Sequence, residues 1–200
     1  MLDVFVTSES RHGAVRVRAG GTPVNAALAI GAGAVVVGRV GDDPGAAAIR
    51  RALADLELQL AVDSELPTGT FVELANGTVF ADRGANAALA LEDVLPLDAD
   101  AVLLSGYLDL PVLEHVDARW RAFICTPVTR RVPEAANVVF ANDDEAARLE
   151  LGDRELLVVT HGPRGSTVYR GGNAVFAGPT GDDETGAGDR LAGSFLRTLV

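Results

Sequence analysis

Short apolar runs, separated by polar or glycine-rich turns, recur along most of the chain. Runs of strand length fall at 34–37, 58–62, 101–105, 122–125, 138–141 and 156–160. Amphipathic stretches at 44–56, 111–120 and 143–151 predict helices between several of them. Continuous apolar strands that alternate with helices indicate a parallel sheet with both faces covered. We therefore expect an α/β fold, a three-layer sandwich around a mainly parallel central sheet.

A second pattern interrupts this alternation and predicts β-hairpins. Residues 68–74 and 78–82 flank the dipeptide Asn76-Gly77, which favours a tight turn. Residues 4–7 and 15–18 are two further strand candidates. Together these strands would form a small sheet that acts as a lid. Another hairpin is expected at 166–169 and 174–177. The prediction is one domain over 1–200, with lid strands from about 4–18 and 68–82.

Length and composition narrow the class of protein. The chain has 200 residues, of which 48% are hydrophobic, enough to bury one sizeable core. Its apolar runs are too short to span a membrane, and no signal-peptide pattern opens the chain. The one cysteine, Cys125, lies in an apolar run and is expected to be a small core residue. We expect a cytoplasmic protein that binds no membrane.

Charge excludes several mechanisms. The formal net charge is −11, which argues against a nucleic-acid partner. All 17 basic residues are arginine, so a P-loop lysine, a Schiff-base lysine and a pyridoxal phosphate anchor are excluded. The three histidines are scattered, with His12 and His115 expected at the surface, and with one cysteine they do not predict a zinc site.

The run Asp183 to Asp189, Asp-Glu-Thr-Gly-Ala-Gly-Asp, opens the last amphipathic stretch. Unpaired amides and the positive end of the dipole make a helix start suitable for an anion. Gly186 and Gly188 would let a phosphate approach the backbone, and Asp189 could accept a proton from an attacking hydroxyl. The alternative is an ordinary helix start with acidic residues.

Three other glycine or asparagine motifs carry candidate chemistry. Gly20-Gly21 with Asn25 precedes an Ala-rich helical stretch and could bind a hydroxyl, although a plain loop is the alternative. Residues 38–43 follow a strand, and we interpret them as a loop in which Asp43 caps the next helix. Gly84-Ala85-Asn86 follows the lid hairpin.

Two motifs follow later strands. Asn142 and Glu145 have the spacing of a capping box, while the functional alternative is a hydrated Mg²⁺ near phosphates. The turn that contains Thr160, Gly162 and Gly165 could admit a nucleotide phosphate or base. In such α/β folds ligands gather at the carboxyl ends of the strands.

In this order, the motifs resemble the ribokinase-like (PfkB) family of carbohydrate kinases over nearly the whole chain. The resemblance implies that the Asp at the end of Asp183–Asp189 is the catalytic base and that Gly186, Ala187 and Gly188 form its anion hole. It implies a nucleotide site and a Mg²⁺ site, the latter reached through water. The substrate residues that it implies are Asp3, Gly20, Gly21, Asn25 and Asn86. Those for nucleotide are Thr160, Gly162, Gly165 and Asp183, and those for Mg²⁺ are Asn142 and Glu145.

The resemblance implies ATP and Mg²⁺ as cofactors, with a monovalent cation as a further candidate. Against the family pattern Glu184 is unusual, and the chain looks shortened at both ends and in several internal segments. We expect that this trimming affects the adenine pocket most.

The first hypothesis is therefore transfer of the ATP γ-phosphoryl group to a hydroxyl of a sugar or sugar-like acceptor, including nucleosides. The alternative is a non-catalytic carbohydrate- or nucleotide-binding module that keeps the fold. A third hypothesis, a dinucleotide-binding oxidoreductase, rests only on Gly31-Ala32-Gly33. The expected partners are a small-molecule substrate and a second copy of the chain, paired through the lid sheet.

Overall fold

A computed structural model describes residues 1–7, 14–178 and 185–200. The chain divides into two compact units, Met1–Val94 and Leu95–Val200, each of which is described by itself. The predictions for His12, Asp183 and Glu184 lie outside the described residues. The interpretation of 1–200 as one domain stays a prediction.

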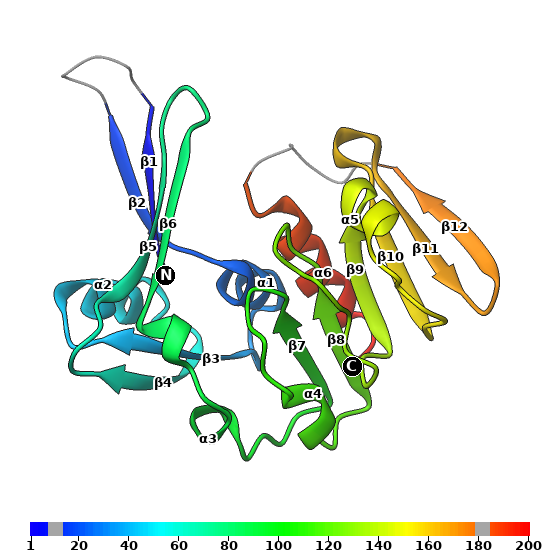
Figure 1. Cartoon of the computed structure of the whole chain (residues 1–200), viewed down its shortest axis with the longest axis horizontal. Coiled ribbons are helices and arrows are strands. Elements are labelled where there is room, and N and C mark those ends of the chain that lie inside the picture. The colour runs from blue at the N-terminus through cyan, green and yellow to red at the C-terminus, as the bar shows by residue number, and fades with distance from the viewer. Residues whose placement is uncertain (8–13, 179–184) are drawn as a thin grey trace. The chain divides into compact units, whose positions relative to one another are not determined.

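The first unit contains the expected small sheet (Figure 1). Its strand order is β2-β1-β5-β6, and only β1 and β5 pair in parallel. The strands are β1 (Leu2–Val6), β2 (Val15–Ala19), β5 (Thr68–Glu73) and β6 (Val79–Gly84). Gly77 has a φ of 79° in the turn between β5 and β6, a conformation that glycine adopts without strain. All four strands predicted for this sheet are present, and its role as a lid stays a prediction.

The rest of the first unit is built on a parallel strand pair. These strands are β3 (Val35–Gly41) and β4 (Glu57–Asp63). The helical elements are α1 (Thr22–Ile30), α2 (Pro44–Ala52), η1 (Ala85–Ala88) and α3 (Leu91–Val94). Buried apolar side chains from α1, β3 and α2, among them Val24, Val36 and Ile49, form one core.

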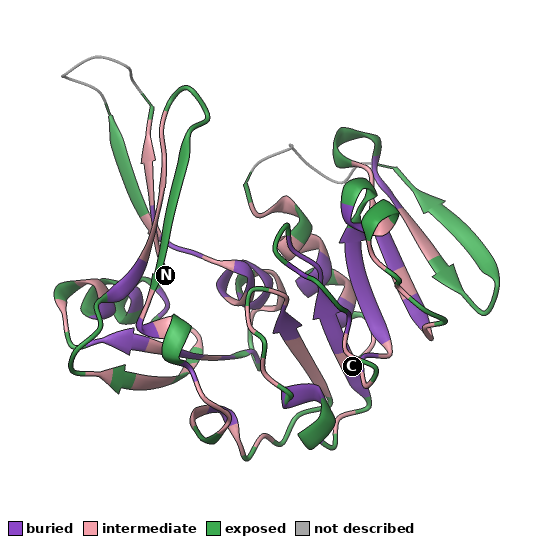
Figure 2. Cartoon of the chain, in the orientation of Figure 1, coloured by how far each residue is buried: buried purple, intermediate pink, exposed green. Residues whose placement is uncertain are grey.

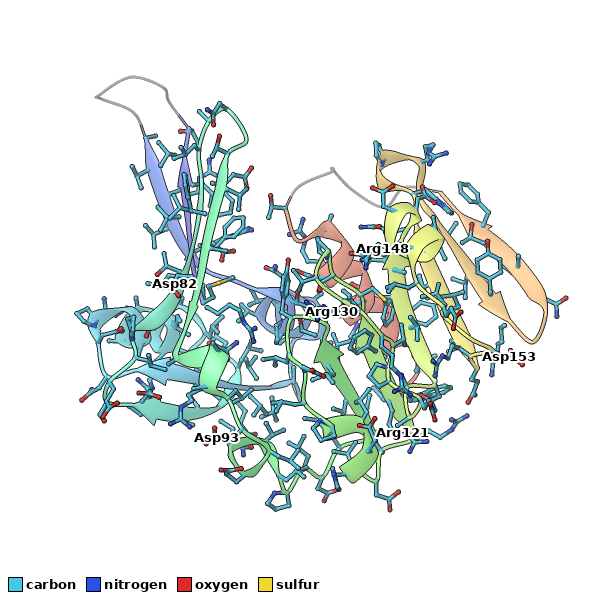
Figure 3. All side chains as sticks on the ribbon, viewed as in Figure 1. Asp82, Asp93, Arg121, Arg130, Arg148 and Asp153 are labelled. Carbon is cyan, nitrogen blue, oxygen red and sulfur yellow. The ribbon has the colours of Figure 1, made fainter. Side chains whose placement is uncertain are left out.

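Strand β3 is longer than the sequence indicated. We predicted a strand at 34–37 and a loop at 38–43, but pairing with β4 continues to Gly41. Arg39 explains the extension, because its side chain lies 3.0 Å from Asp63 and 2.8 Å from Asp93. These contacts fasten β3 to the end of β4 and to α3, where Figure 3 labels Asp93. The interpretation of 38–41 as loop was therefore wrong.

Asp43 caps α2, as predicted, and also fixes the start of β5. Its Oδ1 accepts a hydrogen bond from the Ala46 N–H at 2.9 Å and another from the Thr68 hydroxyl at 2.7 Å. Its Oδ2 accepts from the Thr68 N–H at 2.7 Å. Hydrogen bonds from Thr68 and Ala46 hold the pKa of Asp43 below its ordinary value.

Replacing Asp43 with alanine is expected to lower the free energy of unfolding at pH 7 by about 2 kcal/mol, through the lost cap and lost hydrogen bonds. Urea unfolding measures this, and Asp42→Ala, at the exposed neighbouring carboxylate, is the matched control. The pKa of Asp43 is lower in the folded protein than in the unfolded chain, where it is about 3.9. The stability that Asp43 contributes is therefore fully present above pH ~3.9 and is lost as the pH falls through the folded-state pKa. A difference that did not shrink in acid would contradict this assignment.

The second unit contains a six-stranded sheet in the order β12-β11-β10-β9-β8-β7. Strands β7 to β10 are parallel, whereas β11 and β12 add as an antiparallel hairpin. Figure 2 shows its central strands as buried. The bounds are β7 (Ala101–Ser105), β8 (Trp120–Ile124), β9 (Val138–Asn142), β10 (Leu156–Thr160), β11 (Ser166–Arg170) and β12 (Asn173–Ala177).

Helices cover this sheet, as the three-layer α/β prediction requires. The helical elements are α4 (Val112–His115), α5 (Asp143–Arg148), η2 (Gly162–Arg164) and α6 (Ala187–Arg197). Ala192 and Leu196 of α6 pack on one face, in a core with Phe140 and Val158. Side chains of the opposite face, such as Val139, are equally buried. The mainly parallel α/β sandwich with a separate small sheet is confirmed.

One predicted helix is wrong. We expected a helix over 111–120, but α4 makes a single turn and the chain is already a strand at Trp120. Trp120 is buried, and its indole N–H donates to the Leu199 carbonyl at 3.1 Å. The guanidinium of Arg119 lies 4.0 Å from the centre of its ring. Tertiary packing of this aromatic residue therefore overrides the helical spacing of the apolar positions.

Two arginines fasten the loops after β8 to neighbouring elements. Arg148, at the end of α5 in Figure 3, donates to the carbonyls of Thr129 and Thr126 at 2.6 and 3.2 Å. Arg154 donates to Leu151 at 2.6 Å and to Ala136 at 2.8 Å. Charged donors on backbone carbonyls are among the stronger protein hydrogen bonds.

No helix of the described residues is long and apolar enough to cross a membrane.

Candidate active site

The start of α6 has the geometry of an anion site. Gly186 precedes the helix with φ 87° and ψ 8°, a left-handed conformation that suits glycine. Among the described residues no side chain caps this terminus, and the Gly186 carbonyl accepts the first helical bond from the Arg190 N–H at 3.0 Å. The early amides of α6 can therefore donate to an anion. No atom of the described residues lies within 4 Å of the position that a Cβ on Gly188 would take.

Asp189 lies in the first turn of this helix and is partly buried. A carboxylate here would sit beside a phosphate held by the helix amides. Its negative charge also reaches two other groups of the second unit, because it raises the pKa values of both Glu145 and Tyr107. Asp189 and Glu145, 44 positions apart in the sequence, thus belong to one electrostatic neighbourhood.

Asn142 and Glu145 form the predicted capping box at the start of α5. The Asn142 Oδ1 accepts from the Glu145 N–H at 2.8 Å, and the Glu145 Oε2 accepts from the Asn142 N–H at 2.9 Å. Glu145 is 6% exposed. Burial is the main reason that its pKa is raised, and the charges of Asp144 and Asp189 act in the same direction. The box fixes an acidic group at the carboxyl end of β9.

This donor set fits one kind of magnesium site. In the described parts of the chain, no three Asp, Glu, His or Cys side chains gather as metal ligands. A closed protein cage is therefore not provided by these residues. Mg²⁺ commonly binds through one or two carboxylates, with water and substrate phosphates completing an octahedron. Glu145 and the Asn142 amide oxygen can serve such an ion through water, once nucleotide phosphates supply the other ligands.

The predicted nucleotide turn follows β10, and its glycines have structural reasons. The His161 N–H donates to the Gly165 carbonyl at 2.8 Å, and the Gly165 N–H donates to Gly162 at 3.1 Å. Gly162 has a φ of 58° and Gly165 a φ of 109°. A Cβ on Gly165 would also lie 2.2 Å from the Ala177 carbonyl oxygen. Thr160 is the last residue of β10 and is the register partner of Asn142 at the end of β9.

In the first unit, Asp3 and Gly20 are in direct contact. Asp3 is 3% exposed, and its Oδ2 lies 3.6 Å from Arg18 Nε of β2. A Cβ on Gly20 would fall 1.8 Å from Asp3 Oδ2. The absence of a side chain at Gly20 therefore makes room for the buried carboxylate. Sequence reasoning selected both residues but did not predict that one accommodates the other.

Asn25 and Asn86 have different surroundings in the first unit. Asn25 is buried in α1, one turn after Gly21, whose carbonyl accepts from the Asn25 N–H at 3.0 Å. Asn86 lies in η1, and its Oδ1 accepts from the Arg39 N–H at 3.1 Å. This bond ties η1 to β3, so part of the Asn86 side chain has a structural role.

The oxidoreductase hypothesis finds no support in the local structure. A dinucleotide fingerprint needs its glycines between a strand and the helix that follows. Here Gly31 ends α1, with its N–H donating to Ala27 at 2.8 Å, and β3 comes afterwards. The order of elements is the reverse of the one required.

Two further observations concern the second unit. Sequence reasoning missed Tyr107, which lies two residues beyond the carboxyl end of β7 and whose pKa is raised by burial and then by the charges of Asp189 and Glu145. Its position after a buried strand was the signal that could have found it. Cys125 is a buried core residue, as predicted, and this burial raises its pKa to about 12.

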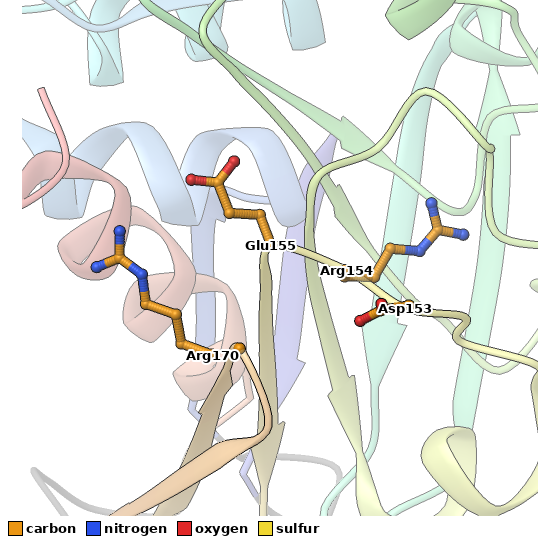
Figure 4. A pocket seen from close by; sticks show the side chains of 5 residues that line it. Asp153, Arg154, Glu155 and Arg170 are labelled. Carbon is orange, nitrogen blue, oxygen red and sulfur yellow. The ribbon is translucent and has the colours of Figure 1, made fainter.

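A hollow of about 370 Å³ lies at the amino end of β10, away from the motif residues at its carboxyl end. Figure 4 shows the mixed charges that line it, and its lining residues are Asp153, Arg154, Glu155, Arg170 and Gly171. Arg154 is already engaged with backbone carbonyls, and Glu155 lies 2.6 Å from Arg119. We assign no chemistry to this hollow.

The comparisons with known proteins support the fold. Ribokinase from Arabidopsis thaliana, complexed with ribose and ATP, matches with a TM-score of 0.78 and 21% identity over 99% of this chain and 82% of its own. Ribokinase from Thermotoga maritima gives 0.79 and 18%, over 99% and 82%. Adenosine kinase from Sinorhizobium meliloti gives 0.76 and 19%, over 100% and 84%. No family model and no curated protein matches the sequence.

At these identities the comparisons establish a shared architecture: this chain has the fold of the ribokinases, adenosine kinases and sugar kinases. That agrees with the architecture that the motif resemblance implied. The roles of individual residues rest on the geometry of this chain.

Proposed function

We propose that this chain transfers the γ-phosphoryl group of ATP to a hydroxyl of a sugar-like or nucleoside acceptor. The observation that carries the proposal is the first turn of α6, where a left-handed glycine opens the helix and Asp189 follows within the same turn. An anion site with a carboxylate beside it suits phosphoryl transfer, in which positioning and charge stabilisation supply most of the rate.

Each group has a separate role in the proposed reaction. The amides at Gly186, Ala187 and Gly188 stabilise negative charge on the transferring phosphoryl group. Asp189 accepts the proton of the acceptor hydroxyl as the new P–O bond forms and ADP leaves. Mg²⁺, when bound, neutralises phosphate charge, and Glu145 with Asn142 would hold its water ligands.

Residues of the first unit would select the acceptor. Asp3 is a buried carboxylate that can accept hydrogen bonds from sugar hydroxyls, and Asn25 can both donate and accept. Gly20 makes room for the Asp3 carboxylate, and Gly21, which is half-buried, would contribute its backbone to the acceptor site. The side-chain NH₂ group of Asn86 would donate to the acceptor. In the second unit, Thr160, Gly162 and Gly165 would receive the nucleotide.

The homodimer through the lid sheet also stays a prediction. Strands β2 and β6 are the edges of that sheet and carry exposed apolar side chains. Val15, Val17 and Phe80 are each more than half exposed, at 60%, 56% and 58%. Contact with a second lid sheet would remove these side chains from water and protect the strand edges.

The proposal predicts acceptor-dependent ADP formation. Purified protein is incubated with ATP and Mg²⁺, and a panel of sugars and nucleosides is added one at a time. At least one acceptor should raise ADP release clearly above the rate with water alone. Stabilisation by ATP in a thermal shift, with no acceptor-dependent turnover, would favour the non-catalytic binding module instead.

A further inference from the structure

His161 makes three side-chain contacts at the nucleotide turn of the second unit. Its Nδ1 lies 2.7 Å from Asp143 Oδ1, and its Nε2 lies 2.8 Å from the Thr167 hydroxyl. Its ring stacks on Phe176, with 6.4 Å between the ring centres and 22° between the planes. The side chain is 18% exposed. This one residue therefore joins β10, α5, β11 and β12.

Arg164 binds the same carboxylate from the other end of the turn. Its Nη2 donates to Asp143 Oδ2 at 2.8 Å, so each oxygen of Asp143 receives one side chain. Asp143 is the first residue of α5, directly after Asn142. The turn 161–165 is thus fastened at both ends to the helix that carries Glu145.

The contacts of His161 orient its ring through both nitrogens. A carboxylate only accepts hydrogen bonds, so Nδ1 is the nitrogen that donates to Asp143. Nε2 contacts the Thr167 hydroxyl, a group that can donate or accept. Each ring nitrogen therefore has a hydrogen-bond partner, and the two partners come from different elements.

We propose that Asp143, His161 and Arg164 form a clamp that holds the turn 161–165 ready for ATP, with His161 as a positioning residue. This inference rests on the proposed function. Ordering the backbone of a residue costs conformational entropy, and with the clamp in place the turn is ordered during folding instead of during ATP binding. Loosening the turn should therefore weaken ATP binding without changing the chemical step.

The test compares three variants by steady-state kinetics and by calorimetric titration with ATP and Mg²⁺. His161→Leu removes both ring hydrogen bonds. His161→Asn places an amide N–H close to the position of Nδ1 and keeps the bond to Asp143. His115→Leu changes an exposed histidine of α4 in the same unit and is the matched control.

For His161→Leu we expect the KM and Kd for ATP to rise about tenfold, which corresponds to one ordered residue. The values of kcat and of the KM for the acceptor should stay within about twofold. His161→Asn should recover part of the ATP affinity, and His115→Leu should behave as the wild type.

Three results would overturn the clamp. One is unchanged ATP affinity in His161→Leu. Another is a parallel loss of kcat and acceptor affinity, which indicates a general structural role. The third is wild-type protein that binds no ATP, which also removes the proposed function. Wild-type protein that binds ATP without turnover defeats the proposed function alone, and the Kd comparison then decides on the clamp.

Discussion

Asp189→Asn is expected to lower kcat by about 10²- to 10⁴-fold, the usual contribution of a general base. Asparagine keeps the size of the side chain at the first turn of α6 but cannot accept the proton of the acceptor hydroxyl. Because the helix amides still receive the phosphates, the KM for ATP should change by less than about threefold. Coupled detection of ADP with a saturating acceptor measures both constants.

The control for this variant is Asp144→Asn. Asp144 is exposed on α5, and its charge, like that of Asp189, raises the pKa of Glu145. The Asp144→Asn substitution also removes one negative charge that acts on Glu145 but leaves the proposed base unchanged, so kcat should stay close to the wild-type value. Equal losses in both variants would mean that local charge matters and that proton transfer to Asp189 does not.

Gly20→Ala is expected to lower kcat/KM for the acceptor by about 100-fold and to leave the KM for ATP unchanged. The new methyl group would overlap the Asp3 carboxylate, whose Oδ2 lies 1.8 Å from the position of the added Cβ. Rotation of that side chain relieves the overlap but removes the carboxylate from the acceptor. Two hydrogen bonds to a charged group, at about 1.5 kcal/mol each, give a loss of this size.

Asp3→Asn provides the comparison for Gly20→Ala, since it removes the charge and leaves the backbone unchanged. Both variants should weaken binding of the acceptor and leave ATP binding unchanged. If Gly20→Ala weakens acceptor binding and Asp3→Asn does not, the acceptor hydroxyl is bound by a group other than Asp3. Melting temperatures of both variants show whether folding contributes to the loss.

Much of the fold could be predicted because its elements carry local signals. The strands at 101–105 and 156–160 were predicted with their observed bounds, since each is a continuous apolar run between polar turns. The Asn76-Gly77 hairpin and the caps at Asp43 and Asn142 follow from residues close together in the sequence. Local chemistry is enough to specify such features.

The errors arose where distant residues decide the structure. The apolar spacing of 111–120 fits a helix, but the packing of Trp120 against the end of the chain requires an extended backbone there. The continuation of β3 to Gly41 depends on Asp63 and Asp93, which lie far along the sequence. Neither partner can be assigned from the local pattern.

In the candidate site, too, the sequence predicted single residues but not the contacts between distant ones. The motifs selected Asp189, Glu145 and Gly20 from the sequence, and the structure adds which groups affect one another. The effect of the Asp189 charge on the pKa of Glu145, the room that Gly20 leaves for Asp3 and the contacts of His161 all depend on tertiary structure. Tyr107 was missed because a lone tyrosine after a strand matches no motif.

Phosphorus NMR of complete reactions, with wild type and Asp189→Asn side by side, is the most direct measurement of the central claim. The account predicts that wild-type protein converts ATP and an acceptor into ADP and a phosphate ester in equal amounts, and that the variant does so at least 100-fold more slowly. Release of inorganic phosphate without an ester, or equal ester formation by both proteins, would contradict it.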